Sequence, residues 1–160
     1  MKNKKAVKPE IAISVDTKDW AKYWPQAKQK VRAIMQHALQ YFPMFEEKIS
    51  LSVLLTDDKK IEDLNSKYRN KNKPTNVLSF PANAGFKRDS AEIFLGDIAL
   101  ALETTVREAQ MKKIAIEAHA AHLLIHGLLH LLCYDHKKTA EAERMEALEA
   151  LILTDYLNKS

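Results

Sequence analysis

Apolar residues in this chain follow two different spacings, and the order of those spacings limits the folds that it can adopt. Short alternating or continuous apolar runs indicate strands, whereas apolar residues three and four positions apart indicate helices. We predict strands at 11–15, 49–55, 76–80 and 93–99. We predict helices at 27–41, after Asp57, in two pieces within 103–132, and from 137–139 onward. This order predicts an α+β domain with a small mixed sheet and most of the helix at the C-terminal end.

The composition is that of one folded domain spanning residues 1–160. The chain is 46% hydrophobic and 29% charged with a net charge of +4, which excludes a disordered protein. Its one cysteine, Cys133, excludes a disulfide within the chain and suits a reducing cytosol. The basic start lacks an apolar signal core, and the most apolar stretch, 120–133, is shorter than a membrane span of about 20 residues. We therefore expect a soluble cytoplasmic protein without a membrane segment.

Five of the six histidines fall between residues 119 and 136. His126 and His130 are four residues apart, so on a helix they share one face and can converge on one metal ion. His136 is ten residues beyond His126, and it reaches the same point only if the chain turns after about Leu132. Three histidines without an obvious fourth protein ligand fit a catalytic zinc site in which water takes the open position. The other interpretation is that these are ordinary histidines of a half-buried helix.

Position 127, directly after the first of these histidines, carries glycine. Zinc peptidases with the H-E-x-x-H motif carry their catalytic glutamate at this position, so Gly127 argues against that class. Glycine within a helix costs about 1 kcal/mol relative to alanine, which indicates that a substrate, a neighbouring backbone or tight helix packing needs the space. Of the two preceding histidines, we expect His122 to support the metal site from behind and His119 to be a packing or surface residue.

The segment 67–73 is rich in lysine and follows a predicted helix. Basic residues at this place suit the helix dipole and solubility, so they need have no further role. Arg69 admits a second interpretation, because a guanidinium can grip phosphate oxygens through two parallel hydrogen bonds. The sequence pI of about 9.0 likewise permits a polyanionic partner such as RNA without demanding one.

Four stretches of the chain resemble one known family. The segment HGLLHLLCYDH at 126–136 resembles the HGxLHLxGYDH signature of the bacterial YbeY proteins, which are metal-dependent endoribonucleases. LNSKYR at 64–69 and PTNVLSFP at 74–81 resemble the family's LNxxYR and PTDVLSFP, and LGDI at 95–98 resembles its LGDI. Together these stretches extend the resemblance over roughly residues 50–157.

The resemblance implies a site as well as a fold. It implies that His126, His130 and His136 bind one zinc ion per chain and, with Arg69, form the catalytic site. It also implies a four-stranded mixed sheet with five or six helices and the metal site on a central helix. The implied activity is cleavage of single-stranded RNA in the maturation of small-subunit ribosomal RNA and in ribosome quality control. The implied partners are the small ribosomal subunit or RNA-processing proteins.

Two positions depart from the family pattern. Cys133 stands where the family has glycine, and Asn76 stands where it commonly has aspartate. A thiolate at position 133 could become a fourth zinc ligand, which would close the site. A closed site would favour the alternative that this chain is a zinc-stabilised, ribosome-associated binding module without nuclease activity. Hydrolysis of a peptide or a small-molecule amide is a third hypothesis.

Overall fold

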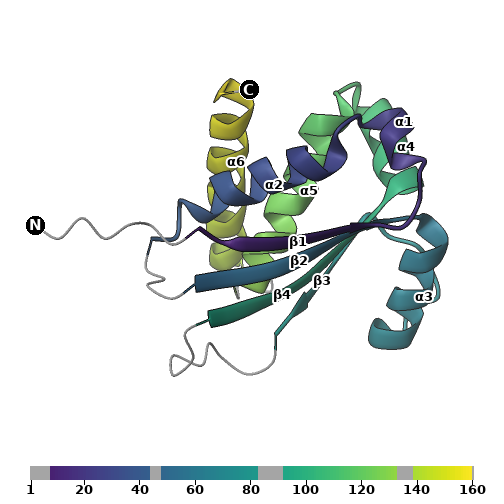
Figure 1. Ribbon diagram of the computed structural model, residues 1–160, viewed down its shortest axis with the longest axis horizontal. Coiled ribbons are helices and arrows are strands. Elements are labelled where there is room, and N and C mark those ends of the chain that lie inside the picture. The colour runs from purple at the N-terminus through teal and green to yellow at the C-terminus, as the bar shows by residue number, and fades with distance from the viewer. Residues whose placement is uncertain (1–7, 44–47, 83–91, 133–138, 160) are drawn as a thin grey trace, which may run out of the picture.

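The computed structural model describes residues 8–43, 48–82, 92–132 and 139–159, and four strands within these ranges form one mixed sheet (Figure 1). The strands are β1 (Glu10–Val15), β2 (Lys48–Thr56), β3 (Val77–Pro81) and β4 (Glu92–Ala101). Their order in the sheet is β1-β2-β4-β3, with β2 parallel to both β1 and β4, and β3 antiparallel to β4. The predicted four-stranded mixed sheet is therefore confirmed.

Six helices accompany the sheet in the described part of the chain. They are α1 (Trp20–Tyr23), α2 (Ala27–Leu39), α3 (Asp58–Arg69), α4 (Leu102–Lys112), α5 (Ile116–Leu131) and α6 (Thr139–Lys159). The predicted α+β class is confirmed, and so is the division of 103–132 into two helices. α1 was not predicted from the sequence, because its four residues are too few to show a helical period.

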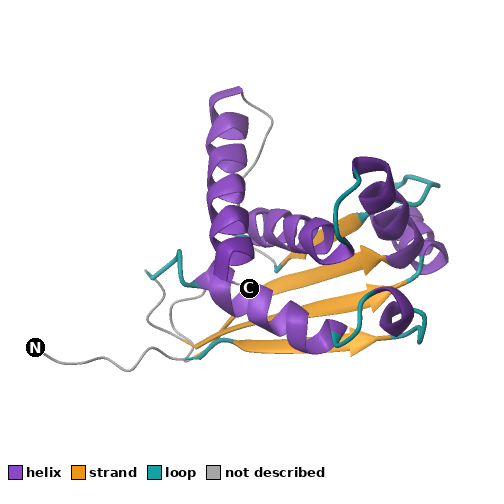
Figure 2. Cartoon of the chain, turned by 90° about the horizontal axis from the view of Figure 1, so that it is seen from above, coloured by secondary structure: helices purple, strands orange, loops and turns teal. Residues whose placement is uncertain are grey.

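Most of the helices cover one face of the sheet (Figure 1 and Figure 2). α2 and α5 lie directly on this face, and α6 packs across both of them. α3 lies against the opposite face, beside β3 and β4. The alternation of side chains along β4 explains both contacts. Ile98 and Leu100 point into the main core, whereas Ala99 and Ala101 point toward Ile61 of α3.

α5 is enclosed by the sheet, α2, α4 and α6. Ten of its sixteen residues are buried. Its sequence, IEAHAAHLLIHGLLHL, has one acidic residue and no lysine or arginine, as a helix buried on most sides requires. α5 is therefore the central helix of the fold, and it carries four histidines, of which His119 is buried and the other three are partly exposed.

Tight packing accounts for the glycine within α5. A Cβ atom on Gly127 would lie 3.0 Å from Oγ of Ser79 on β3 and 3.2 Å from Cγ2 of Ile98 on β4. The Ser79 hydroxyl also donates a hydrogen bond of 3.1 Å to the main-chain oxygen of Gly127. Among the explanations left open by the sequence, the structure therefore favours close packing of the helix on the sheet.

Gly127→Ala is expected to destabilise the protein by about 1 kcal/mol. Alanine gains about 1 kcal/mol in helix propensity, but overpacking against Ser79 and the fully buried Ile98 should cost about 2 kcal/mol. Urea unfolding of the variant and the wild type measures the difference. The double variant Gly127→Ala with Ser79→Ala removes the closest contact and should lose less than the sum of the single changes. A single variant more stable than wild type would contradict the packing argument.

β4 contains a β-bulge where it pairs with β2. Ser50 pairs with Phe94, but Ser52 pairs with Asp97, so β4 has one residue more than β2 in this interval. Gly96 within the bulge has a φ of +138°, which side chains of L-residues rarely permit. The bulge therefore depends on glycine at this position.

Within the described ranges, no single helix combines the length and the apolar composition of a membrane span. α4 and α5 reach that composition only when they are taken together, and they meet at a bend of 117°.

Candidate metal and RNA site

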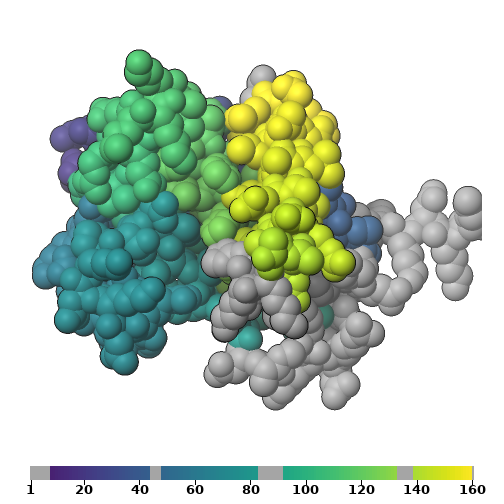
Figure 3. All heavy atoms as spheres, turned by 180° about the vertical axis from the view of Figure 1, so that it is seen from behind, coloured from purple at the N-terminus to yellow at the C-terminus, as the bar shows by residue number. Residues whose placement is uncertain are grey.

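A cleft of about 1230 Å³ is lined by α3, β3 and α6, and α5 forms its floor. Figure 3 shows α3 and β3 (teal) on one side, α6 (yellow) on the other and α5 (green) between them. Most of the charged side chains that line the cleft lie on these two sides, and Lys112 of α4 also lines it. The α3–β3 side carries Arg69, Lys71 and Lys73, whereas α6 contributes Glu146 and Glu149. The cleft thus has a basic side and an acidic side.

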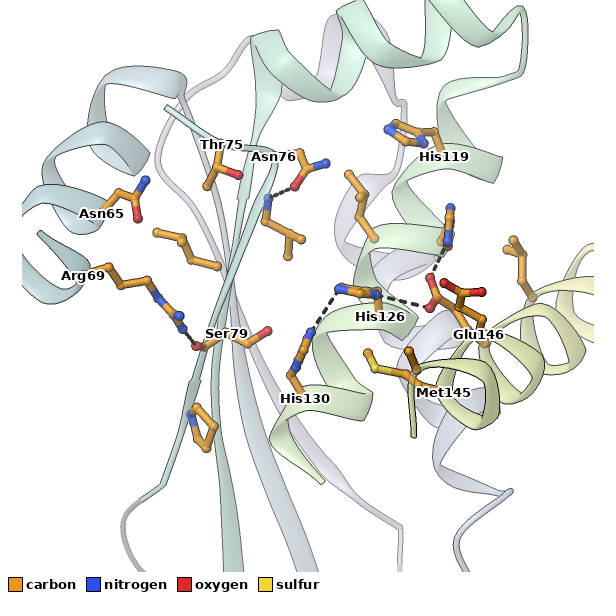
Figure 4. Close-up of a pocket in the computed structure, with 18 of the residues that line it drawn as sticks. Asn65, Arg69, Thr75, Asn76, Ser79, His119, His126, His130, Met145 and Glu146 are labelled. Atoms are coloured by element: carbon orange, nitrogen blue, oxygen red, sulfur yellow. Dashed lines mark hydrogen bonds and ion pairs between the residues drawn. The ribbon is translucent and has the colours of Figure 1, made fainter. Parts of the chain in front are cut away.

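His126 and His130 lie next to each other on one face of α5, and both line the cleft (Figure 4). Their Nε2 atoms are 3.0 Å apart, and their ring centroids are 4.6 Å apart. The four-residue spacing places the two rings one helical turn apart, as the sequence predicts. Two imidazole nitrogens are thus directed at the same small volume.

The histidine pair fits a zinc ion. Tetrahedral zinc with Zn–N distances of about 2.05 Å holds two nitrogens about 3.3 Å apart, which is close to the separation of 3.0 Å found here. His136, the third predicted ligand, lies outside the described residues, and so does Cys133. Within the described ranges, no group of three or more histidine, cysteine, aspartate or glutamate side chains is arranged to hold a metal. The third ligand therefore stays a prediction.

Glu149 of α6 contacts two histidines of α5. Its Oε2 atom is 3.2 Å from Nδ1 of His126, and its Oε1 atom contacts Nε2 of His122. Only 6% of the residue is exposed. Burial raises the pKa of this carboxyl, but the hydrogen bonds with His122 and His126 lower it by more, so that the pKa falls to about 2. Glu149 is therefore an ionised carboxylate that accepts hydrogen bonds from both rings.

Glu149 was not predicted from the sequence, although its spacing along α6 holds a signal. Glu149 lies on the buried stripe of α6 with Met145, Ile152 and Tyr156, where a helix that only packs would carry an apolar residue. A glutamate in such a stripe indicates a polar partner inside the molecule. The local sequence does not show which partner this is, because the histidines belong to another helix.

Arg69, the last residue of α3, lines the same cleft from the side of β3 (Figure 4). Its Nη2 atom donates a hydrogen bond to the main-chain oxygen of Ser79. α3 ends at this point because the next residue, Asn70, adopts a left-handed conformation with a φ of 54°. The structure therefore brings Arg69, His126 and His130 to one cleft, and of the predicted site residues only His136 lies outside the described part of the chain.

His119 belongs to a separate polar cluster at the edge of the cleft. It is 1% exposed, and its Nε2 atom lies 2.9 Å from Oε1 of Glu108. The same oxygen accepts a hydrogen bond of 3.0 Å from Nδ2 of Asn76. Burial raises the pKa of Glu108, but the hydrogen bonds from His119 and Asn76 outweigh it and hold the pKa below its usual value. Asn76 thus donates to a carboxylate, which an ionised aspartate cannot do.

Asn76→Asp is expected to destabilise this chain at pH 7 by about 1–2 kcal/mol, because it replaces a donor by a second carboxylate beside Glu108. The pKa of Glu108 is lower in the native state than in the unfolded state. Its hydrogen bonds therefore stabilise the fold above the unfolded pKa of about 4.3, and this contribution is lost as the pH falls through the native pKa. Urea unfolding should accordingly show a smaller difference between variant and wild type at pH 4 than at pH 7.

Asn76→Ala is the matched control for this prediction, since it removes the donor without adding a charge. It should lose less stability than Asn76→Asp at pH 7. Equal losses for the two variants at pH 7 would show that the added carboxylate has no effect.

Comparisons with known proteins identify the family of this chain. A family model described as Endoribonuclease YbeY matches residues 12–157. An Endoribonuclease YbeY from Methylocella silvestris is 42% identical over 147 residues, which cover 92% of this chain and 82% of the relative. One from Sinorhizobium medicae is 40% identical over 150 residues, with coverage of 90% and 89%. One from Wolbachia pipientis is 41% identical over 143 residues, with coverage of 89% and 91%.

The fold has a counterpart among solved structures. A solution structure of a protein from Thermotoga maritima superposes with a TM-score of 0.60 at 23% sequence identity, and the match covers 93% of this chain and 90% of that one. The family match spans the histidine helix, the cleft and nearly all of the sheet. This chain therefore belongs to the Endoribonuclease YbeY family.

Proposed function

We propose that this protein is a zinc-dependent endoribonuclease that cuts single-stranded RNA. In this proposal His126, His130 and His136 hold one zinc ion per chain, and Arg69 contacts the phosphate at the cleavage site. As a member of an endoribonuclease family, the chain is a nuclease, that is, a hydrolase of phosphodiester bonds in RNA. The observation that supports the zinc site is the pair of Nε2 atoms 3.0 Å apart, in a cleft that Arg69 also lines.

The two sides of the site have complementary chemical roles. Zinc, when bound, supplies a Lewis acid that polarises a phosphate oxygen. Arg69 neutralises negative charge that develops on the phosphate during cleavage. Its guanidinium has five N–H donors, and the hydrogen bond to Ser79 uses one of them. Because this bond holds the guanidinium against β3, part of its orientation is set before RNA binds.

The distribution of charge suggests how RNA lies in the cleft. Lys71 and Lys73 line the same side as Arg69, and ammonium groups attract the phosphates of an RNA backbone. The α6 side presents carboxylates, which repel phosphates. The backbone therefore follows the α3–β3 side, and cleavage falls steeply as the salt concentration rises.

The cellular role belongs to the same proposal. We place the activity in the cytoplasm, in the maturation of small-subunit ribosomal RNA and in ribosome quality control. The small ribosomal subunit or RNA-processing proteins would then be the partners. The basic side of the cleft and the single cysteine, which suits a reducing compartment, support this placement.

The role of Arg69 is tested by replacing it with alanine. Arg69→Ala should lower the rate of cleavage of a labelled single-stranded RNA by about 100-fold, while the zinc content of the purified protein stays at the wild-type level. Arg69→Lys should recover only part of the rate, because an ammonium lacks the planar pair of donors. Arg32→Ala removes an exposed arginine of α2 outside the cleft and should change the rate less than twofold.

Three results would contradict parts of the proposal. Cleavage by Arg69→Ala at the wild-type rate would show that Arg69 has no role in catalysis. Equal cleavage of single-stranded RNA and of a duplex of the same sequence would exclude the single-strand preference. Zinc binding that stabilises the fold without any RNA cleavage would favour the binding module instead.

A further inference from the structure

We propose that Glu149 is a positioning residue that fixes the tautomer and the ring orientation of His126, so that Nε2 of His126 faces the metal. The inference rests on the proposed zinc site, since it describes how one ligand of that site is held. It concerns a residue of α6 that lies 23 positions from His126 in the chain and does not itself face the Nε2 pair.

The hydrogen-bonding pattern around His126 determines which of its nitrogens is protonated. Oε2 of Glu149 lies 3.2 Å from Nδ1 of His126. An ionised carboxylate only accepts hydrogen bonds, so Nδ1 must be the donor and carry the proton. In the neutral ring Nε2 then has a lone pair, and this is the atom that lies 3.0 Å from Nε2 of His130. A zinc ligand needs this lone pair, and ligand histidines commonly donate their other N–H to a carboxylate.

His122 holds the carboxylate in place. Its Nε2 atom contacts Oε1, so the two oxygens of Glu149 are bound to rings that lie one helical turn apart on α5. Rotation of the carboxyl group would break both contacts at once. His122 therefore supports His126 through Glu149, and its own side chain is 40% exposed.

Packing of α6 does not need the carboxylate. Met145, Ile152 and Tyr156 on the same stripe are buried, and the Tyr156 hydroxyl donates a hydrogen bond of 3.1 Å to Glu117 of α5. A buried carboxylate is costly to desolvate, and a leucine at position 149 would pack without that cost. We therefore expect α6 to stay docked on α5 when Glu149 is replaced.

The test measures zinc affinity and the histidine tautomer in the same set of variants. Glu149→Leu should weaken zinc binding by about 10–100-fold in competition with a chromophoric chelator. Glu149→Gln keeps an acceptor oxygen and should lose less than tenfold. Glu143→Gln removes the same charge from an exposed position of α6 outside the cleft lining and should change the affinity less than twofold.

Nitrogen-15 NMR of the metal-free proteins gives a readout that does not depend on zinc. His126 should carry its proton on Nδ1 in the wild type and lose this preference in Glu149→Leu. Glu149→Leu with wild-type zinc affinity and an unchanged tautomer would overturn the inference. If Glu149→Leu does not fold, Glu149→Met, which also lacks an acceptor oxygen, takes its place, and wild-type affinity and tautomer in that variant would overturn the inference.

The two proposals fail in different ways. A wild-type protein that binds no zinc contradicts the proposed function, and the NMR comparison then still decides the role of Glu149. A wild type that binds zinc together with a Glu149→Leu variant that binds it equally well contradicts this inference alone.

Discussion

His130→Ala is expected to reduce the zinc content of the purified protein to well below one ion per chain and to slow RNA cleavage by about 1000-fold or more. The change removes one of the two Nε2 atoms that lie 3.0 Å apart on α5. In the proposed site only two protein ligands would remain, which would hold zinc far more weakly than three, and loss of the ion would remove the Lewis acid. Mass spectrometry of the native protein gives the zinc content, and single-turnover cleavage gives the rate.

His37→Gln is the matched control, because His37 lies on α2 outside the lining of the cleft. It should keep the wild-type zinc content and cleavage rate. Thermal unfolding of metal-free His130→Ala should lie close to that of the metal-free wild type, since the ring is only partly buried. A His130→Ala variant that keeps both zinc and the wild-type rate would remove this residue from the metal site.

The parts of the fold that the sequence predicts correctly are those with a local period. The strands and α2 are visible because one face of each is buried, which repeats apolar residues at intervals of two or of three and four. The strand order β1-β2-β4-β3 has no such local signal, because it depends on which strands pair, and these strands are far apart in the sequence. The bulge at Gly96 is equally hidden, since it exists only in the pairing of β4 with β2.

In the candidate site too, contacts within one helix could be predicted from the sequence, whereas contacts between elements could not. The pairing of His126 with His130 follows from helical geometry alone, and the structure places the two rings together. Neither the support of Arg69 by Ser79 nor the contact of Glu149 with His126 could be derived, because each joins two elements whose relative position is set by the whole core. The resemblance to the family motifs identified Arg69 as a site residue, but it gave no indication of Glu149.

Gly96→Ala is expected to destabilise the protein by about 4 kcal/mol or more, or to prevent folding. A Cβ atom at this position would lie 2.3 Å from the main-chain oxygen of Phe80 and 3.0 Å from the main-chain nitrogen of Ala82. Neither atom can move without breaking the pairing of β3 with β4. The φ of +138° adds strain that no movement of neighbouring side chains relieves.

Gly96→Ala should also disturb the candidate site, because neighbours of Gly96 belong to β3 and α5, and these two elements hold site residues. The added Cβ would lie 2.9 Å from Cδ2 of Leu131, next to His130 on α5, and a displaced β3 would move the Ser79 oxygen that holds Arg69. Urea unfolding and the yield of soluble protein measure the effect. Phe94→Ala, at an exposed position on the same strand, should change stability by less than about 1 kcal/mol. A Gly96→Ala variant as stable as Phe94→Ala would show that the bulge does not require glycine.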